Sequence, residues 1–304
     1  MELWTLQLLN GSRKSDCRNT NKETATSNYE VIKWSVVHRM KDLLKQGEVD
    51  LLKYEIVDNN KEDWVVFIHG IGGSTKTWKK QVDSFSKKFN LLLLDLPGHG
   101  SNSNNIIHSV DAKRLNKGIK ETLNHLKIKA AHFVGLSLGT IVVAQFAVQN
   151  PSYVKSIIMG GSALLLMGFQ KSYVWLANAM KRIVPYKLLY QFFAWFLLPK
   201  SNHKKSRKIF LREVVKLDKE TMYAWIDYLK YAVNPGKLFD QLNQLGKKIL
   251  FISGDEDHCF LRGVKLINKK IKSSDLKIIE HCGHVCSIER ADEFNTAAVE
   301  YLAA

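Results

Sequence analysis

The sequence predicts an α/β fold with a mostly parallel, doubly wound sheet and an inserted helical segment. From residue 51 onward, apolar runs of strand length alternate with helix-length stretches, which is the pattern of a parallel sheet with helix crossovers. The strand-like runs are almost continuously apolar, as in residues 91–94, which is typical of strands buried on both faces. The alternation stops between Gly161 and Pro235 and then resumes. This gap is interpreted as an insertion into one sheet domain.

Four segments follow from this pattern. Residues 1–50 are predicted to be an N-terminal extension, a polar flexible arm followed by a possible amphipathic helix. Residues 51–160 and 236–304 are the two parts of the α/β core, and residues 161–235 form a helical cap between them. A chain of 304 residues is long enough for one such domain with a large core.

The elements are assigned from periodicity and from their bounding residues. The predicted strands are residues 51–57, 64–68, 91–94, 130–134, 154–159, 248–252 and 276–279. The predicted core helices are residues 77–89, 110–126, 140–149, 261–271 and 292–302. Ser109 stands at the N-cap position of the second helix.

The formal net charge of +16 is unevenly distributed. Residues 1–60 hold nine Lys/Arg and nine Asp/Glu, whereas residues 161–235 hold thirteen Lys/Arg against four Asp/Glu, a net of +9. Such an excess belongs either to solvated helix faces or to a surface that binds an anionic substrate, an acidic carrier protein or an anionic lipid surface. No nucleic-acid-binding motif accompanies it, so nucleic acid is not an expected partner. The pattern does not predict an oligomeric state.

Composition predicts a cytoplasmic protein. The four cysteines are too few and too unevenly spaced for a disulfide framework, so free thiols are expected. The sequence contains no stretch approaching 18 consecutive apolar residues. Residues 1–9 include Glu2, have no basic flank and precede no small-residue cleavage pattern, so no signal peptide is expected.

The run Gly135-Leu136-Ser137-Leu138-Gly139 lies between a predicted strand and a predicted helix. A serine at the apex of such a turn is the nucleophile elbow. Glycines at both flanks are expected because the serine backbone is strained and the neighbouring chain is too crowded for a Cβ atom. Ser137 is therefore the candidate nucleophile, and an ordinary strand–helix turn is the alternative.

A glycine-rich loop, His69 to Ser74, follows the strand 64–68. Its backbone N–H groups can point at an anion, so the N–H of Ile71 is expected to form an oxyanion hole with the N–H of Leu138. Gly70 is expected to lie against the substrate. A phosphate-binding loop is the alternative, although the glycine spacing matches neither the dinucleotide nor the P-loop pattern.

A serine nucleophile needs a base and a carboxylate that orients it, and both candidates follow later strands. Asp255 and Asp257 follow the strand 248–252, and His281 and His284 follow the strand 276–279. We choose His284 as the base because it follows a glycine and precedes the last helix. We choose Asp257 as the acid because it projects furthest from the strand end, with Asp255 as the alternative. The chain order of serine, acid and histidine is that of an elbow-type sheet.

These motifs, in this order, resemble the α/β-hydrolase superfamily, in its esterase-like branch with a helical cap. The matching motifs are His69-Gly70, Asp95-x-Pro97-Gly98-x-Gly100, Gly135-x-Ser137-x-Gly139, Gly254-x-x-Asp257 and Gly283-His284. The resemblance covers about residues 51–304 and implies an α/β-hydrolase fold with Asp257 as the triad acid. Serine at the elbow, in place of aspartate, argues against the epoxide hydrolase and haloalkane dehalogenase branches.

His99 and the two cysteines beside His284 are interpreted as structural or incidental. His99 lies in a tight turn shaped by proline and glycines, so we expect a structural role for it. The run Cys282-Gly283-His284-Val285-Cys286 invites a metal site, but its spacing is unusual for zinc and a metal would occupy the lone pair that the base needs. We therefore expect no metal and no cofactor.

The predicted cap is rich in aromatic residues, some of which should line an acyl pocket above Ser137. Trp175 and Phe193 are the candidates for substrate contact. The expected function is hydrolysis of carboxylic esters, with medium-chain acyl groups favoured, through an acyl-enzyme on a Ser-His-Asp triad. Two alternatives remain open: a carbon–carbon bond hydrolase that uses the same triad, and a non-catalytic signalling protein that binds a ligand in the same pocket.

Overall fold

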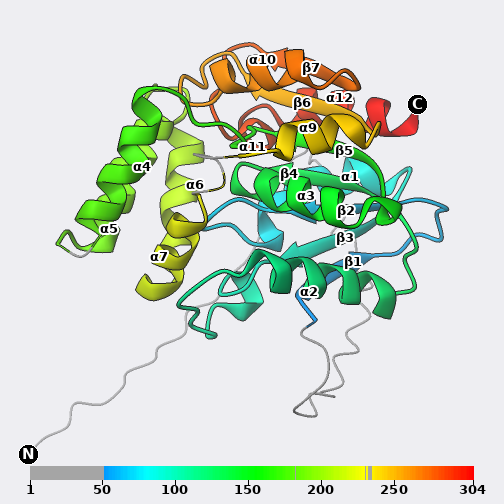
Figure 1. The fold of residues 1–304 in the computed structure, drawn as a ribbon, viewed down its shortest axis with the longest axis horizontal. Coiled ribbons are helices and arrows are strands. Elements are labelled where there is room, and N and C mark those ends of the chain that lie inside the picture. The colour runs from blue at the N-terminus through cyan, green and yellow to red at the C-terminus, as the bar shows by residue number, and fades with distance from the viewer. Residues whose placement is uncertain (1–50, 182, 230, 232–234) are drawn as a thin grey trace, which may run out of the picture. The chain divides into compact units, whose positions relative to one another are not determined.

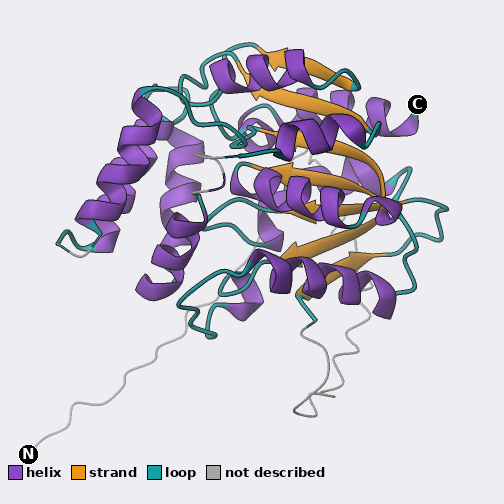
Figure 2. Cartoon of the chain, in the orientation of Figure 1, coloured by secondary structure: helices purple, strands orange, loops and turns teal. Residues whose placement is uncertain are grey.

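The computed structural model describes residues 51–304 except 182, 230 and 232–234. The arm and helix predicted within residues 1–50 therefore lie outside the described residues. One seven-stranded sheet runs through the described part (Figure 2). Its strands are β1 (Lys53–Val57), β2 (Trp64–Ile68), β3 (Asn90–Asp95), β4 (Ala131–Leu136), β5 (Val154–Gly160), β6 (Lys248–Gly254) and β7 (Ser274–Ile279).

The strand order is β1-β3-β2-β4-β5-β6-β7. Only β1 is antiparallel to its neighbour, and every other pair of adjacent strands is parallel. The central strands β3 and β4 are buried along their whole length, as the continuous apolar runs predict. The predicted mostly parallel sheet is thus confirmed. Because parallel strands end at the same edge, the loops after β2, β3, β4, β6 and β7 all open on one side of the sheet.

Helices cover both faces of the sheet (Figure 1). Helices α2, α3, α9 and α10 lie side by side on one face, and α1 contacts α12 on the other. The core helices are α1 (Lys79–Ser86), α2 (Ala112–His125), α3 (Leu138–Gln149), α9 (Leu238–Gln244), α10 (Leu261–Lys270), α11 (Cys286–Glu289) and α12 (Ala291–Ala303). Helix α3 is buried almost throughout, because it lies between the sheet and its neighbours.

The helix starts differ in detail from the prediction. Ser109 does not cap α2; the cap is Asp111, whose carboxylate accepts the Lys113 N–H at 2.9 Å. An ionised side chain is the stronger acceptor, and it also interacts favourably with the helix dipole. The predicted helix 77–89 is a short 3-10 turn (Thr75–Trp78) followed by α1.

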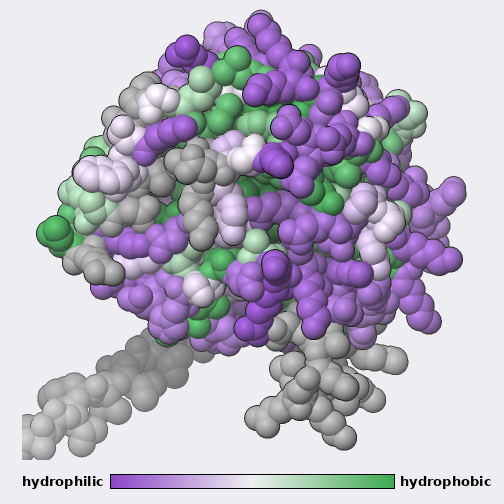
Figure 3. Space-filling model, in the orientation of Figure 1, coloured by the Kyte–Doolittle hydropathy of each residue, from purple (hydrophilic) through white to green (hydrophobic). Residues whose placement is uncertain are grey.

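Between β5 and β6, in the segment predicted as the helical cap, the chain forms α4 (Phe169–Met180), α5 (Tyr186–Leu197), α6 (Lys204–Val214) and α7 (Lys219–Tyr228). Large apolar side chains on α4 and α5 are exposed, at the end of the molecule where pale and green residues mix with purple ones in Figure 3. They are Trp175, Leu176, Leu188, Phe192 and Trp195. Docking of an acidic protein or an anionic lipid surface on this basic segment stays a prediction. No helix in the described part of the chain is long and apolar enough to span a bilayer.

Asp95, at the end of β3, joins two loops at the open edge of the sheet. Its carboxylate accepts the Thr75 N–H and the Ser101 N–H, each at 2.8 Å, and the side chain is buried. A buried carboxylate that accepts two backbone N–H bonds holds both donors in place. The loop that follows β2 and the loop that follows β3 are thereby tied to one point.

Two buried histidines continue this link. His69 Nε2 accepts the Leu96 N–H at 3.1 Å, and His99 Nε2 accepts the Gly72 N–H at 3.0 Å. Their Nδ1–H groups donate to the carbonyls of Gly70 and Pro97. Each ring therefore has to be neutral, and burial lowers the pKa of both; for His99, burial and then the neighbouring His69 lower the pKa to about 3. The structural role expected for His99 is visible as a hydrogen bond that shapes the glycine-rich loop.

Replacing Asp95 with alanine should lower the free energy of unfolding by about 2–4 kcal/mol, because two backbone donors lose a charged acceptor. Urea unfolding followed by circular dichroism measures this change. Asp83→Ala is the control, since Asp83 is exposed on α1, and it should change stability by less than about 0.5 kcal/mol. Equal stability of the Asp95→Ala and Asp83→Ala proteins would contradict the assigned link.

The lowered pKa of His99 predicts a pH-dependent stability. An unfolded histidine titrates near 6.5, so between that pH and about 3 the unfolded chain holds one proton more than the folded chain at this residue. Stability should therefore fall as the pH drops through this window, by up to about 1.4 kcal/mol per pH unit from this residue. In the His99→Gln variant, urea unfolding at pH 6, 5 and 4 should show a shallower slope. His125→Gln, at an exposed position on α2, should keep the wild-type slope, and a wild-type slope in both variants would refute the assignment.

Candidate active site

Ser137 stands alone between the last residue of β4 and the first residue of α3. Its backbone has φ 52° and ψ −121°, a conformation that side-chain-bearing residues rarely adopt. The turn is possible because Gly139 passes close to β2: a Cβ atom there would lie 2.2 Å from the Ile68 carbonyl oxygen. The strand thus turns directly into the helix, with Ser137 at the apex, as the elbow pattern predicts.

Ser137, His284 and Asp257 form one hydrogen-bonded series. Ser137 Oγ lies 2.8 Å from His284 Nε2, and His284 Nδ1 lies 2.8 Å from Asp257 Oδ2. The imidazole and the carboxylate are both 1% exposed. Because Asp257 accepts the Nδ1–H, the Nε2 lone pair faces the hydroxyl and can take its proton. The Phe260 ring stacks on His284 with centroids 4.7 Å apart and covers one side of the imidazole.

The loops that carry the acid and the base meet because of Gly254, at the end of β6. A Cβ atom there would lie 2.0 Å from the Cys282 carbonyl oxygen, so only glycine allows this approach. Asp255 accepts the Cys282 N–H at 3.1 Å and does not reach the imidazole. Of the two candidate acids, the structure therefore places Asp257 against His284, and it places His281 on the surface.

The two expected oxyanion donors lie beside Ser137, and both residues line the cavity at its hydroxyl. Leu138 is the first residue of α3, where helix geometry leaves the backbone N–H without an intrahelical acceptor. In the glycine-rich loop, the N–H groups of Gly72 and Gly73 close the turn, the first to His99 and the second to the Gly70 carbonyl. The N–H of Ile71 is not needed for that turn.

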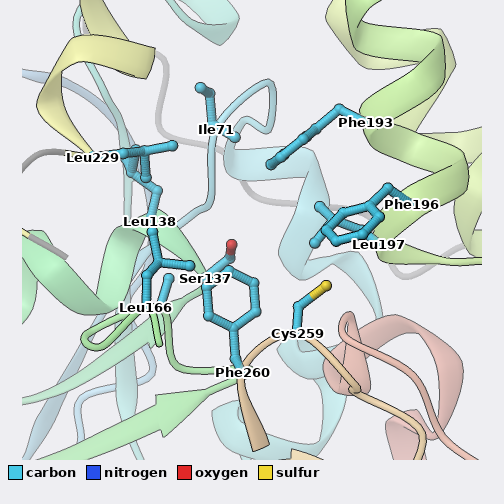
Figure 4. Close-up of a pocket in the computed structure, with 11 residues that line it drawn as sticks. Ile71, Ser137, Leu138, Leu166, Phe193, Phe196, Leu197, Leu229, Cys259 and Phe260 are labelled. Carbon is cyan, nitrogen blue, oxygen red and sulfur yellow. The ribbon is translucent and has the colours of Figure 1, made fainter. Parts of the chain in front are cut away.

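An apolar cavity opens above the hydroxyl (Figure 4). Phe193, Phe196 and Leu197 form the wall contributed by α5, with Cys259 next to it, and Leu138, Leu166 and Leu229 lie on the opposite side. The remaining described lining residues are Ile71, Ser137, Ala163 and Phe260. Ser137 supplies the hydroxyl at its floor, and the rest of the lining is almost entirely hydrocarbon, so the cavity suits an apolar group of a substrate.

A second cavity is also lined by Ser137, and it is the one that His284 lines. Its lining is more polar and includes Thr77, Ser206 and the carboxylate of Glu213. Gly70, expected to contact substrate, lines this cavity. Ser137 thus lines both an apolar cavity and a partly polar one.

Trp175 does not lie where substrate contact was expected. It is 72% exposed on α4 and is not among the residues lining either cavity, because the helix turns this residue to solvent. Phe260, Leu166 and Leu229 line the apolar cavity and were not predicted. Phe260 is three residues after the acid, but nothing in the local pattern separates it from a core residue. Leu166 and Leu229 come from loops whose path depends on the fold.

The cysteines flanking the base are buried thiols. Both ring nitrogens of His284 are engaged by Ser137 and Asp257. Burial raises the pKa of both Cys282 and Cys286, the latter to about 12, and so disfavours the thiolate form that binds metals. These observations agree with interpreting the run as incidental thiols beside a base.

Comparison with known proteins adds independent findings. Residues 63–205 match the family model for the alpha/beta hydrolase fold. A 2-hydroxy-6-oxononadienedioate/2-hydroxy-6-oxononatrienedioate hydrolase from Dechloromonas aromatica is 28% identical over 288 residues, which cover 85% of this chain and 93% of the relative. A carboxylesterase structure from Nitrososphaera gargenis has a TM-score of 0.70 at 23% identity, covering 83% of this chain and 94% of that one. The enol-lactonase from Burkholderia xenovorans LB400 has a TM-score of 0.69 at 21% identity, covering 83% and 96%.

The strand order, the serine at the turn from β4 into α3 and the family match all lead to the same assignment. Structural similarity at these identities shows the fold, and the proteins that share it include both esterases and hydrolases of other bonds. The chain has the α/β-hydrolase fold, and its residues 63–205 match the model of that family.

Proposed function

We propose that this hydrolase cleaves carboxylic esters, with medium-chain acyl groups favoured, through an acyl-enzyme on Ser137. One observation carries the proposal: the unbroken series from Ser137 through His284 to Asp257 ends at the floor of an apolar cavity. Such a series activates the hydroxyl for attack on an adjacent carbonyl carbon. The apolar cavity is suited to hold the acyl chain attached to that carbonyl.

In this proposal, Ser137 Oγ attacks the acyl carbonyl while His284 Nε2 accepts the hydroxyl proton. Asp257 holds the imidazole in the correct tautomer and stabilises the imidazolium. The N–H groups of Ile71 and Leu138 donate to the oxyanion as it forms. His284 then protonates the departing alkoxide, and a water molecule, deprotonated by His284, releases the acid and restores the serine.

In this proposal, each of the two cavities binds one part of the ester. His284 has to protonate the leaving group, and it lines the second cavity but not the apolar one. The alcohol part therefore belongs in the second cavity, with Thr77 and Ser206 as hydrogen-bonding partners, and the acyl part in the first.

The second cavity also contains a charged residue, Glu213. Burial raises the pKa of Glu213, but hydrogen bonds from Lys216 and Arg212 outweigh this effect and keep the carboxylate ionised.

Carbon–carbon bond hydrolysis is the second candidate, because the Dechloromonas aromatica relative is named as a hydrolase of 2-hydroxy-6-oxononadienedioate, a compound that has a keto group and no ester. That relative's substrate is named as a dioate, a compound with two carboxylates. Of the described residues that line either cavity, none is Lys or Arg, and the nearby cations Lys216 and Arg212 are already paired with the carboxylate of Glu213. A dianion would lose its hydration without gaining a cation, which is costly. This charge pattern supports a neutral ester over a dioate.

Replacing Ser137 with alanine should reduce turnover of a p-nitrophenyl ester by about a million-fold, because no other group can form the acyl-enzyme. A stopped assay of p-nitrophenol release measures the loss. The wild type, but not the variant, should also gain the mass of a fluorophosphonate probe at Ser137. Ser162→Ala is the matched control, since this buried serine has no hydrogen-bond partner, and it should keep both activities. Normal turnover by Ser137→Ala would end the assignment, and an unlabelled wild type would favour the non-catalytic signalling alternative.

A panel of substrates should separate the remaining candidates. We expect kcat/KM to rise from acetate to hexanoate or octanoate p-nitrophenyl esters, by about ten-fold for each two or three methylene groups that become buried. Dianionic diketone substrates should be cleaved poorly. A strict preference for acetate would contradict the acyl-cavity assignment, and faster cleavage of the diketones than of any ester would make the chain a carbon–carbon bond hydrolase.

A further inference from the structure

A polar cluster links the inserted segment to the two loops that carry the acid and the base. Its centre is Glu256, the residue directly before Asp257. Lys200 Nζ lies 2.8 Å from Glu256 Oε1, and Asn202 Nδ2 donates to Glu256 Oε2 at 2.7 Å. Hydrogen bonds from Asn202 and Lys200 lower the pKa of Glu256 to about 2, so the carboxylate is ionised.

The third member from the inserted segment is His203, at the start of α6. Its side chain is fully buried, and Nε2 lies 2.8 Å from Glu256 Oε2 and 3.7 Å from Glu289 Oε2. The imidazole also lies against the chain beside the base: a Cβ atom on Gly283 would be 2.8 Å from His203 Nε2. One ring thus contacts the residue before Asp257 and the residue before His284.

Glu289 fastens the other side of this contact. Its Oε2 accepts the Gly283 N–H at 2.8 Å, and its Oε1 accepts the Val285 N–H at 3.0 Å. Both chain neighbours of His284 are therefore held by one carboxylate, which is 5% exposed. The backbone around the base can shift only if Glu289 shifts with it.

Removing the His203 ring would leave the carboxylates of Glu256 and Glu289 facing each other without the N–H group between them. Two buried carboxylates repel, and a buried carboxylate that loses a partner pays for its lost hydration. The loops are also joined by the Glu256 N–H donating to the Cys282 carbonyl at 2.9 Å, so we expect a shift and not a separation. A displacement well under 1 Å is enough to weaken a nucleophile–base–acid series.

From this geometry we infer that His203 is a positioning residue, which couples docking of the inserted helices to alignment of Asp257 and His284. The inference rests on the proposed function, because it assumes that the series activates Ser137. It gives the inserted segment a second role besides lining the acyl cavity, which is to align Asp257 and His284. The series is aligned when α6 is docked, and it loosens when the segment moves away.

The test compares His203→Ala with Lys204→Ala, an exposed neighbour on the same helix. For His203→Ala, we expect kcat on p-nitrophenyl hexanoate to fall by about ten- to a hundred-fold, with KM changed by less than about two-fold. Labelling of Ser137 by a small fluorophosphonate should slow by the same factor, because it depends on the serine and not on the acyl cavity. His203→Gln, which keeps an N–H donor near the position of Nε2, should recover most of both rates. Lys204→Ala should behave as wild type.

A double variant shows whether His203 acts through Glu256. If it does, His203→Ala combined with Glu256→Gln should lose no more activity than the worse single variant, whereas independent roles would give multiplied losses. If His203→Ala does not fold, Glu256→Gln alone tests the contact: it should slow labelling of Ser137, and a wild-type labelling rate would overturn the role of His203.

These experiments distinguish a failure of the proposed function from a failure of the role assigned to His203. A wild type that reacts with neither ester nor probe would overturn the proposed function and this inference with it. A reactive wild type, combined with a His203→Ala protein whose kcat and labelling rate stay within two-fold of it, would overturn the role of His203 alone. A rise in KM at constant kcat would do the same, since it would make His203 a wall of the substrate cavity.

Discussion

The turn at Ser137 is the constraint on which the rest of the site depends. A left-handed backbone at a serine is unfavourable, and it persists only because the surrounding chain leaves no other path. That path is set by the close approach of α3 to β2 at Gly139. The same geometry raises the serine side chain above the sheet edge and places the first N–H of α3 beside it. The proposed nucleophile and the proposed oxyanion donor are therefore products of one strained turn.

Around this turn, buried polar groups hold the neighbouring loops in place. The Asp95 carboxylate accepts an N–H group from each of two loops, whereas His69 and His99 are neutral rings that each accept a backbone N–H. The neutral state of the histidines is essential to the arrangement, because a protonated ring could not accept at Nε2. The glycine-rich loop beside Ser137 is thus shaped by side chains that never reach the substrate cavity.

The inserted helices act on the site in two ways. Their apolar side chains, among them Phe193 and Phe196, close one wall of the apolar cavity. Their polar residues before α6 approach the loops of the acid and the base through Glu256. The apolar contacts favour a hydrocarbon chain without specifying its shape, whereas the charged contacts require a defined geometry. Substrate preference and alignment of the catalytic groups would accordingly be separable by mutation.

The parallel sheet and the candidate residues Ser137, Asp257 and His284 could be predicted from the sequence, because continuous apolar runs and short glycine motifs are local signals. Spacing alone favoured Asp257 over Asp255. The residues that surround the site became visible only in the folded chain. Trp175, which was expected to contact the substrate, is exposed to solvent, and Phe260 stacks on the imidazole of His284. These contacts join residues far apart in the chain, and they depend on the direction each side chain takes after packing, which local periodicity does not encode.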